Sequence, residues 1–156
     1  MQRVHLIVFV LIVSLVSVGI AAEKTNTFKV KLTGSKVVPP VKTPARGEAI
    51  FNKGRTTNEV TYKLTVHNLQ GATAAHIHEG KKGKNGPPVA TLFAGPTKTA
   101  KFSGTLAEGT ITAKDLIGPL KGKSLKELVH LMNTGDAYVN VHTEKYPDGE
   151  LRGQIK

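Results

Sequence analysis

The sequence lacks cysteine and tryptophan, and its 11 acidic residues are half as numerous as its 22 basic residues. The absence of cysteine excludes disulfides, thiolate metal sites and lipid attachment at a cysteine. A folded domain must therefore depend on its hydrophobic core. Aromatic residues make up only 5% of the chain and none interleaves with a basic cluster, which argues against nucleic acid as a partner.

An apolar run occupies the N-terminus, from Val4 to Ile20, between Arg3 and Ala21-Ala22. This order of a basic residue, an apolar stretch and small residues is typical of a signal peptide, which we expect over residues 1–22. Cleavage would leave one secreted or periplasmic domain of about 134 residues. Because an apolar run of about 17 to 19 residues can also span a bilayer, an uncleaved membrane anchor is the alternative.

Positive charge dominates the rest of the chain. The formal net charge is +11, and loss of Arg3 with the signal would leave 21 basic against 11 acidic side chains, or +10. Such an excess favours an acidic partner, namely an anionic polysaccharide, a phosphate-bearing envelope polymer or a membrane surface. The alternative is that the scattered lysines form solvated faces that keep an exported protein soluble.

Beyond the signal, apolar and polar residues mostly alternate, as in 28–32 and 60–66. This period of two predicts half-buried antiparallel strands. Further strands are expected over 49–52, 72–78, 89–93, 102–111, 137–143 and 150–155. Turn-forming residues separate them. The pattern predicts an all-β fold, either an antiparallel β-sandwich or a flattened Greek-key barrel of about eight strands.

One segment, 124–133, has helical spacing instead. Its apolar side chains recur every three or four residues, Ser124 and Glu127 match a capping box, and Gly135 follows as a stop signal. We expect a short helix there, closing one end of the sheets. His130 within it is expected to be a surface or end-capping residue, and His67 an ordinary residue at a strand end.

Two histidines one residue apart, His76 and His78, are the strongest functional signal, together with His142 in the predicted strand 137–143. Alternate residues of a strand share a face, so His76 and His78 can bind the same ion. If the two strands are neighbours, all three imidazoles converge and leave a coordination position open. The pattern predicts one copper or zinc ion at His76, His78 and His142.

Two alternatives to a metal site remain open at this point. The histidines can form a hydrogen-bonded network with both ring nitrogens satisfied, for which Glu79, Glu144 and Glu150 are available partners. They can also recognise a ligand directly. If a metal is bound, Glu79 and Asn140 are the expected hydrogen-bond partners of the ligating rings, and the lack of nearby cysteine or methionine favours zinc(II) or copper(II) over copper(I).

The glycine-rich segment 80–88 and the last strand have structural interpretations. Segment 80–88 lacks the spacing of a phosphate-binding loop, so a long hairpin with lysines in water is expected, or an anion attracted beside the histidines. In the last strand, Leu151 and Ile155 share one face, and Arg152 on the other is expected to pair with Glu150 or with a carboxylate of a neighbouring strand.

Several short strings follow one another in an order known from one family. They are Val37-Val38-Pro39-Pro40-Val41, His76-Ile77-His78-Glu79-Gly80, Asn85-Gly86-Pro87, Tyr138-Val139-Asn140-Val141-His142-Thr143 and Gly149-Glu150-Leu151-Arg152-Gly153-Gln154-Ile155. Over about residues 26–156 the chain thus resembles the CHRD domain, named from chordin, and is most similar in organisation to the single-domain secreted bacterial type. The resemblance implies a compact β-sandwich whose role is binding rather than catalysis.

A weaker similarity links the His-X-His string to the copper ligands of copper/zinc superoxide dismutases. The further zinc-binding string and the disulfide of those enzymes have no counterpart here, and no Ser-His-Asp grouping, carboxylate pair or dinucleotide fingerprint stands out. The sequence therefore predicts an exported, non-catalytic binding domain that holds a divalent metal. A small copper-dependent enzyme and an adhesive envelope module without metal are the alternatives.

Overall fold

The computed structural model describes residues 27–54 and 58–156. The predicted signal peptide or anchor at 1–22 lies outside these residues, and no described helix is long and apolar enough to cross a membrane. The strands are β1 (Thr27–Thr33), β2 (Arg46–Lys53), β3 (Val60–Leu69), β4 (Ala72–Glu79), β5 (Pro88–Phe93), β6 (Phe102–Ile111), β7 (Ala137–Thr143) and β8 (Leu151–Ile155), and the helices are α1 (Leu125–Thr134) and the 3-10 turns η1 (Gly34–Lys36), η2 (Ala113–Asp115) and η3 (Gly118–Leu120).

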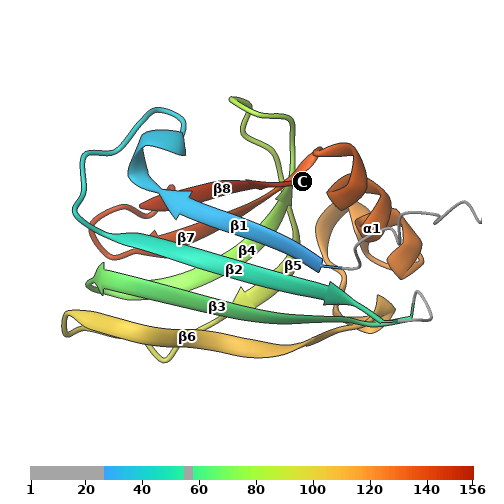
Figure 1. Cartoon of the computed structure of the whole chain (residues 1–156), viewed down its shortest axis with the longest axis horizontal. Helices are drawn as coiled ribbons and strands as arrows, with labels where there is room; N and C mark the ends of the chain where they lie inside the picture. Colours follow the sequence, from blue (N-terminus) through green and yellow to red (C-terminus); the bar gives the residue numbers. More distant parts are fainter. Residues whose placement is uncertain (1–26, 55–57) are drawn as a thin grey trace, which may run out of the picture.

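The eight strands form one antiparallel sheet in the order β5-β4-β7-β8-β1-β2-β3-β6. The sheet curls into a nearly closed barrel, with α1 at one end (Figure 1). Near the gap between the edge strands, the hydroxyl of Tyr62 in β3 donates a hydrogen bond to the carbonyl oxygen of Leu92 in β5, at 2.8 Å. The all-β prediction is confirmed, and of its two architectures the structure has the barrel.

The alternating pattern explains how the barrel fills. In β1, Phe28, Val30 and Leu32 are buried while the lysines between them are exposed. The central strands β7 and β8 are buried almost throughout, because the core covers their inner face and loops cover their outer face. Strands predicted at 102–111 and 137–143 match β6 and β7 residue for residue.

Helix α1 packs its buried side chains, Leu125, Leu128, Val129 and Met132, against the core and ends at Gly135. Gly135 has a φ of 73°, a left-handed conformation that glycine adopts at little cost. The predicted capping box is wrong, since the Ser124 side chain makes no capping hydrogen bond. The described residues place a capping box instead at Thr112 and Asp115, around η2.

Strand pairing places a polar layer outside the barrel. Strand β7 lies between β4 and β8, and the register sets His76 beside Asn140 and His78 beside Tyr138. Arg152 of β8 lies beside Asn140 on the other side. Because neighbours in register project to the same face, these side chains form a single outer layer over the three strands.

Candidate metal centre

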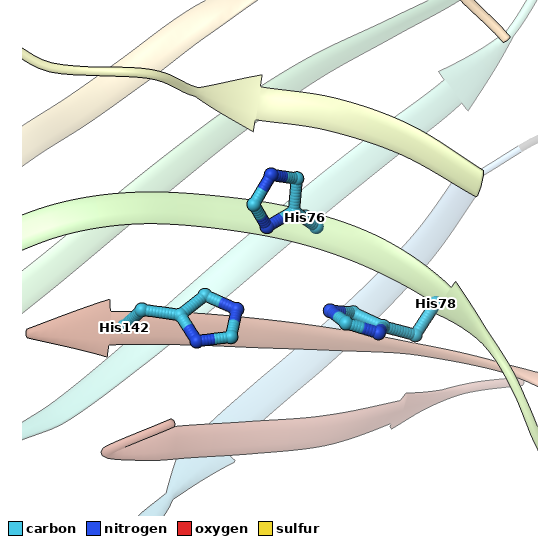
Figure 2. Close-up of side chains that lie close together, drawn as sticks. All are labelled: His76, His78 and His142. Atoms are coloured by element: carbon cyan, nitrogen blue, oxygen red, sulfur yellow. The ribbon is translucent and has the colours of Figure 1, made fainter. Parts of the chain in front are cut away.

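The three predicted ligands meet on this outer layer. His76 and His78 come from β4 and His142 comes from the adjacent β7, and the three rings turn toward a common point (Figure 2). The ring centroids lie 5.3 Å apart for His76 and His142 and 5.8 Å apart for the other two pairs. One nitrogen from each residue lies within 4.8 Å of the others. The expected convergence of three imidazoles from two neighbouring strands is therefore confirmed.

Backbone carbonyls fix the tautomers of two of these rings. Nδ1 of His78 lies 2.9 Å from the carbonyl oxygen of Gly86, and Nδ1 of His142 lies 2.7 Å from that of Pro147. A carbonyl oxygen only accepts, so each Nδ1 must carry the proton. In the neutral ring Nε2 then has a free lone pair, which is the form that binds a metal.

Each of the three rings also has one buried nitrogen with no hydrogen-bond partner. These atoms are Nδ1 of His76, Nε2 of His78 and Nε2 of His142. Buried polar atoms normally have a partner. Three clustered imidazole nitrogens that no protein group engages are available to coordinate one ion, and they do not fit a network in which protein groups satisfy both nitrogens of every ring.

Burial keeps two of the rings neutral. Burial, together with the charges that His142 and His78 can carry, lowers the pKa of His76 from 6.5 to about 4. Burial also lowers the pKa of His78, against a smaller opposing effect of its hydrogen bond to Gly86. Because protonated imidazole cannot coordinate, these shifts favour the metal-binding form at neutral pH.

The hydrogen-bond partners of the histidine rings differ from those expected. Glu79 and Asn140 were predicted to orient the imidazoles, but the acceptors are the carbonyls of Gly86 and Pro147. Asn140 contributes indirectly, because its Nδ2 donates to the carbonyl of Asp148, 2.9 Å away, in the same loop as Pro147. The two loops that follow β4 and β7 thus hold the rings of His78 and His142.

Arg152 belongs to the support of this site and not to an ion pair. Its guanidinium lies 3.6 Å from the centroid of the Tyr138 ring, and that ring stacks on His78 at 5.0 Å. Its nitrogens donate to Oδ1 of Asn85 and to the carbonyls of Lys81 and Lys84. The predicted partner is wrong: within 27–54 and 58–156, no carboxylate pairs with Arg152.

Of the acidic residues proposed for a structural network, Glu150 has another role. Glu150 is buried and accepts hydrogen bonds from the hydroxyls of Thr43 and Thr143. His67 and His130 are both exposed and lie outside the cluster of three histidines. The group of potential metal ligands found in the described part of the chain consists of the three histidines alone.

Comparison with known proteins agrees with this architecture. The family model described as the CHRD domain matches residues 28–155. The chain belongs to the CHRD domain family. This CHRD domain is similar to a chordin from Xenopus laevis, 30% identical over 134 residues, and to a chordin from Danio rerio, 31% identical over 145 residues.

These matches cover 81% and 88% of the chain but only 12% and 14% of the two chordins. The CHRD domain described here thus spans about an eighth of the length of these relatives. No solved structure matches the chain. The predicted single-domain secreted bacterial type stays a prediction, since both relatives are vertebrate proteins.

Reasoning from the sequence missed Tyr138 as part of this site in the CHRD domain. The signal for it was present, because residues 138, 140 and 142 share one face of a strand. No sequence pattern indicated the carbonyls of Gly86 and Pro147, because every residue carries a carbonyl. The paths of the two loops determine which carbonyls lie beside the rings. The same holds for the carbonyls that accept from Arg152.

Proposed function

We propose that this protein is an exported, non-catalytic binding domain that holds one zinc(II) or copper(II) ion through His76, His78 and His142. The observation that carries the proposal is the set of three buried, unpartnered imidazole nitrogens directed into one space. Export rests on the predicted signal at residues 1–22, and the binding role rests on membership of the CHRD family.

The donor set fits these metals. Zinc and copper(II) favour imidazole ligands, and a three-histidine set leaves at least one coordination position for water or another ligand. In a tetrahedral zinc site, bonds of about 2.0–2.1 Å place ligand nitrogens about 3.4 Å apart. Since the nitrogens here lie within 4.8 Å of one another, small ring rotations would complete the site.

The described surroundings of the histidines supply no negative charge to neutralise a bound divalent ion. No carboxylate belongs to the cluster among the described residues, so a bound divalent ion would keep its positive charge beside the Arg152 guanidinium. Such a charge favours hydroxide or another anion in the open position. We also propose that the partner of this binding domain is acidic, because the chain has a formal net charge of +11.

Metal titration of the full-length protein, purified without a histidine tag, tests the proposal. Isothermal calorimetry at pH 7.5 should show one zinc or copper(II) ion per chain. Alanine at any one of the three histidines should weaken binding at least about tenfold, because water replaces a positioned imidazole poorly. The matched control is His130→Ala, on the exposed face of α1, which should bind as the unmodified protein does.

Absence of metal uptake by the unmodified, folded protein would end the proposal. Equal weakening by His130→Ala would also contradict it. The rival function, a small copper enzyme acting on superoxide, is separated by a superoxide assay of the copper-loaded protein. A binding domain should react no faster than free copper at the same concentration.

A further inference from the structure

A second site lies on the neighbouring outer surface, where three parts of the chain enclose a cleft of about 360 Å³. The segment that contains η1 forms one side, the loop after β4 forms another, and the end of β8 forms the third. We call it the basic cleft, because the charged side chains that line it are Lys36, Lys82, Arg152 and Lys156. Its volume is at the lower end of the range of about 300–1,000 Å³ for small-molecule sites.

No acidic side chain lines the basic cleft. Burial lowers the pKa of Lys36, and the charges of Lys156, Lys31 and Lys82 lower it further. Arg152 adds a fixed charge, being 2% exposed and bound to neutral acceptors only. The cleft therefore concentrates positive charge that no protein group lining it neutralises, and a bound anion would relieve the repulsion.

The walls of the cleft are held in place before any ligand binds. Nδ2 of Asn85 donates to the carbonyl of Val38 at 2.8 Å, which joins the loop after β4 to the η1 segment. Arg152 and Gln154 of β8 donate to carbonyls of the same loop. A preformed site loses less entropy on binding than a flexible one.

One wall of the cleft is apolar rather than charged. It consists of Val37, Val38 and Pro40, and the neutral polar side chains Ser35 and Gln154 also line the cleft. An inorganic anion would use the lysines and leave this apolar wall exposed. A ligand that uses every wall has several acidic groups, hydroxyls and a carbon ring with an apolar face.

We propose that the basic cleft binds an acidic saccharide, a sugar ring that carries carboxylate or sulfate groups. The acidic groups lie against the three lysines, and the C–H face of the ring packs on the apolar wall. This proposal gives a location to the acidic partner proposed above and is independent of metal at the histidines. Nucleic acid is disfavoured, since no aromatic side chain lines the cleft for base stacking.

The test is calorimetric titration of the full-length protein with two probes, a galacturonate oligosaccharide and a sulfated oligosaccharide of equal length. Titrations run at about 0.15 M ionic strength, where the Debye length is about 8 Å and diffuse attraction is largely screened. EDTA is present, so metal binding has no part in the result. Binding of either probe supports the proposal, and the tighter one identifies the acidic group.

Variants separate the cleft from net charge. Changing Lys36, Lys82 and Lys156 together to glutamine should weaken binding at least tenfold. The matched control changes Lys29, Lys123 and Lys126, which are exposed outside the cleft, and should weaken binding less than twofold. Val38→Ser should weaken saccharide binding several-fold without altering the weak binding of inorganic sulfate.

Three results would overturn the proposal. The first is no binding of either saccharide by the folded protein. The second is an equal loss in the two triple variants, which would mean diffuse charge attraction. The third is tighter binding of DNA or of phosphatidylglycerol vesicles than of both saccharides, with the same dependence on the three lysines.

Discussion

The ring of His76 links burial to the pH dependence of folding. Its pKa is about 4 in the folded protein, whereas an unfolded histidine has a pKa near 6.5. Between about pH 6.5 and 4 the unfolded chain therefore takes up a proton that the folded protein does not. By linkage, this residue lowers the free energy of unfolding as pH falls through that window, and has no such effect above it.

Denaturant unfolding of the metal-free protein between pH 7 and 4.5 measures this effect. We expect His76→Gln to show a smaller loss of stability on acidification than the unmodified protein. The exposed His130→Gln should retain the full dependence. Identical pH profiles for the unmodified protein and His76→Gln would show that His76 protonates alike in the folded and unfolded states.

Arg152 is the second residue whose surroundings lead to a prediction. Its planar guanidinium stacks on Tyr138 and donates to three acceptors of one loop. Lysine keeps the charge but not the fork or the flat face. Arg152→Lys should therefore lower the free energy of unfolding by about 2 to 4 kcal/mol, measured by urea denaturation.

Arg46 is the matched control for this substitution, because it is exposed on β2. Arg46→Lys should change stability by less than about 0.5 kcal/mol. If the two lysine variants were equally stable, the contacts of Arg152 would contribute nothing that a flexible ammonium group cannot supply.

At the scale of elements, the loop between β4 and β5 binds side chains from both β4 and β8. It supplies the acceptor for His78 through Gly86, and its other carbonyls bind Arg152 and Gln154. A Cβ at Gly86 would lie 1.9 Å from the carbonyl oxygen of Glu79. The loop can therefore approach β4 only with glycine at this position.

Gly86→Ala should displace the loop and cost about 3 kcal/mol or more, since the added Cβ would clash with backbone atoms of Glu79, which cannot turn aside as a side chain can. Gly83→Ala in the same loop is the control. Its Cβ would meet nothing within 4 Å, although its φ is 78°, so it should cost only about 1 to 2 kcal/mol. Thermal unfolding compares the stabilities of the two variants. The NMR signals of the His78 ring should shift in Gly86→Ala and not in Gly83→Ala. A larger loss for Gly83→Ala would contradict this loop path.

At the scale of the whole molecule, stability depends on the barrel core, as expected of a chain without cysteine. Leu151 and Ile155 are fully buried on the inner face of β8. Alanine at either position should cost about 2 to 4 kcal/mol in denaturant melts, through lost burial and a residual cavity. Lys81→Ala and Lys84→Ala should each cost less than about 0.5 kcal/mol, because Arg152 contacts only their carbonyls. Larger effects from the lysines would contradict the orientation of β8.

Much of this architecture could be predicted because it depends on local chemistry. The alternation of apolar and polar residues determined the strands and which side chains face inward, since a strand has a period of two. The same period placed His76 and His78 on one face. Glycine determined where α1 ends, because a left-handed residue follows its last turn.

The tertiary structure alone decided what depends on neighbours distant in the sequence. The order of the strands made β4 and β7 adjacent and so brought His142 to the other two histidines. The loop paths decided which carbonyls fix the ring tautomers, and they gave Arg152 neutral acceptors instead of a carboxylate. Side-chain patterns encode which face a residue occupies, but backbone carbonyls are the same at every position, so only the folded path selects the ones that bind.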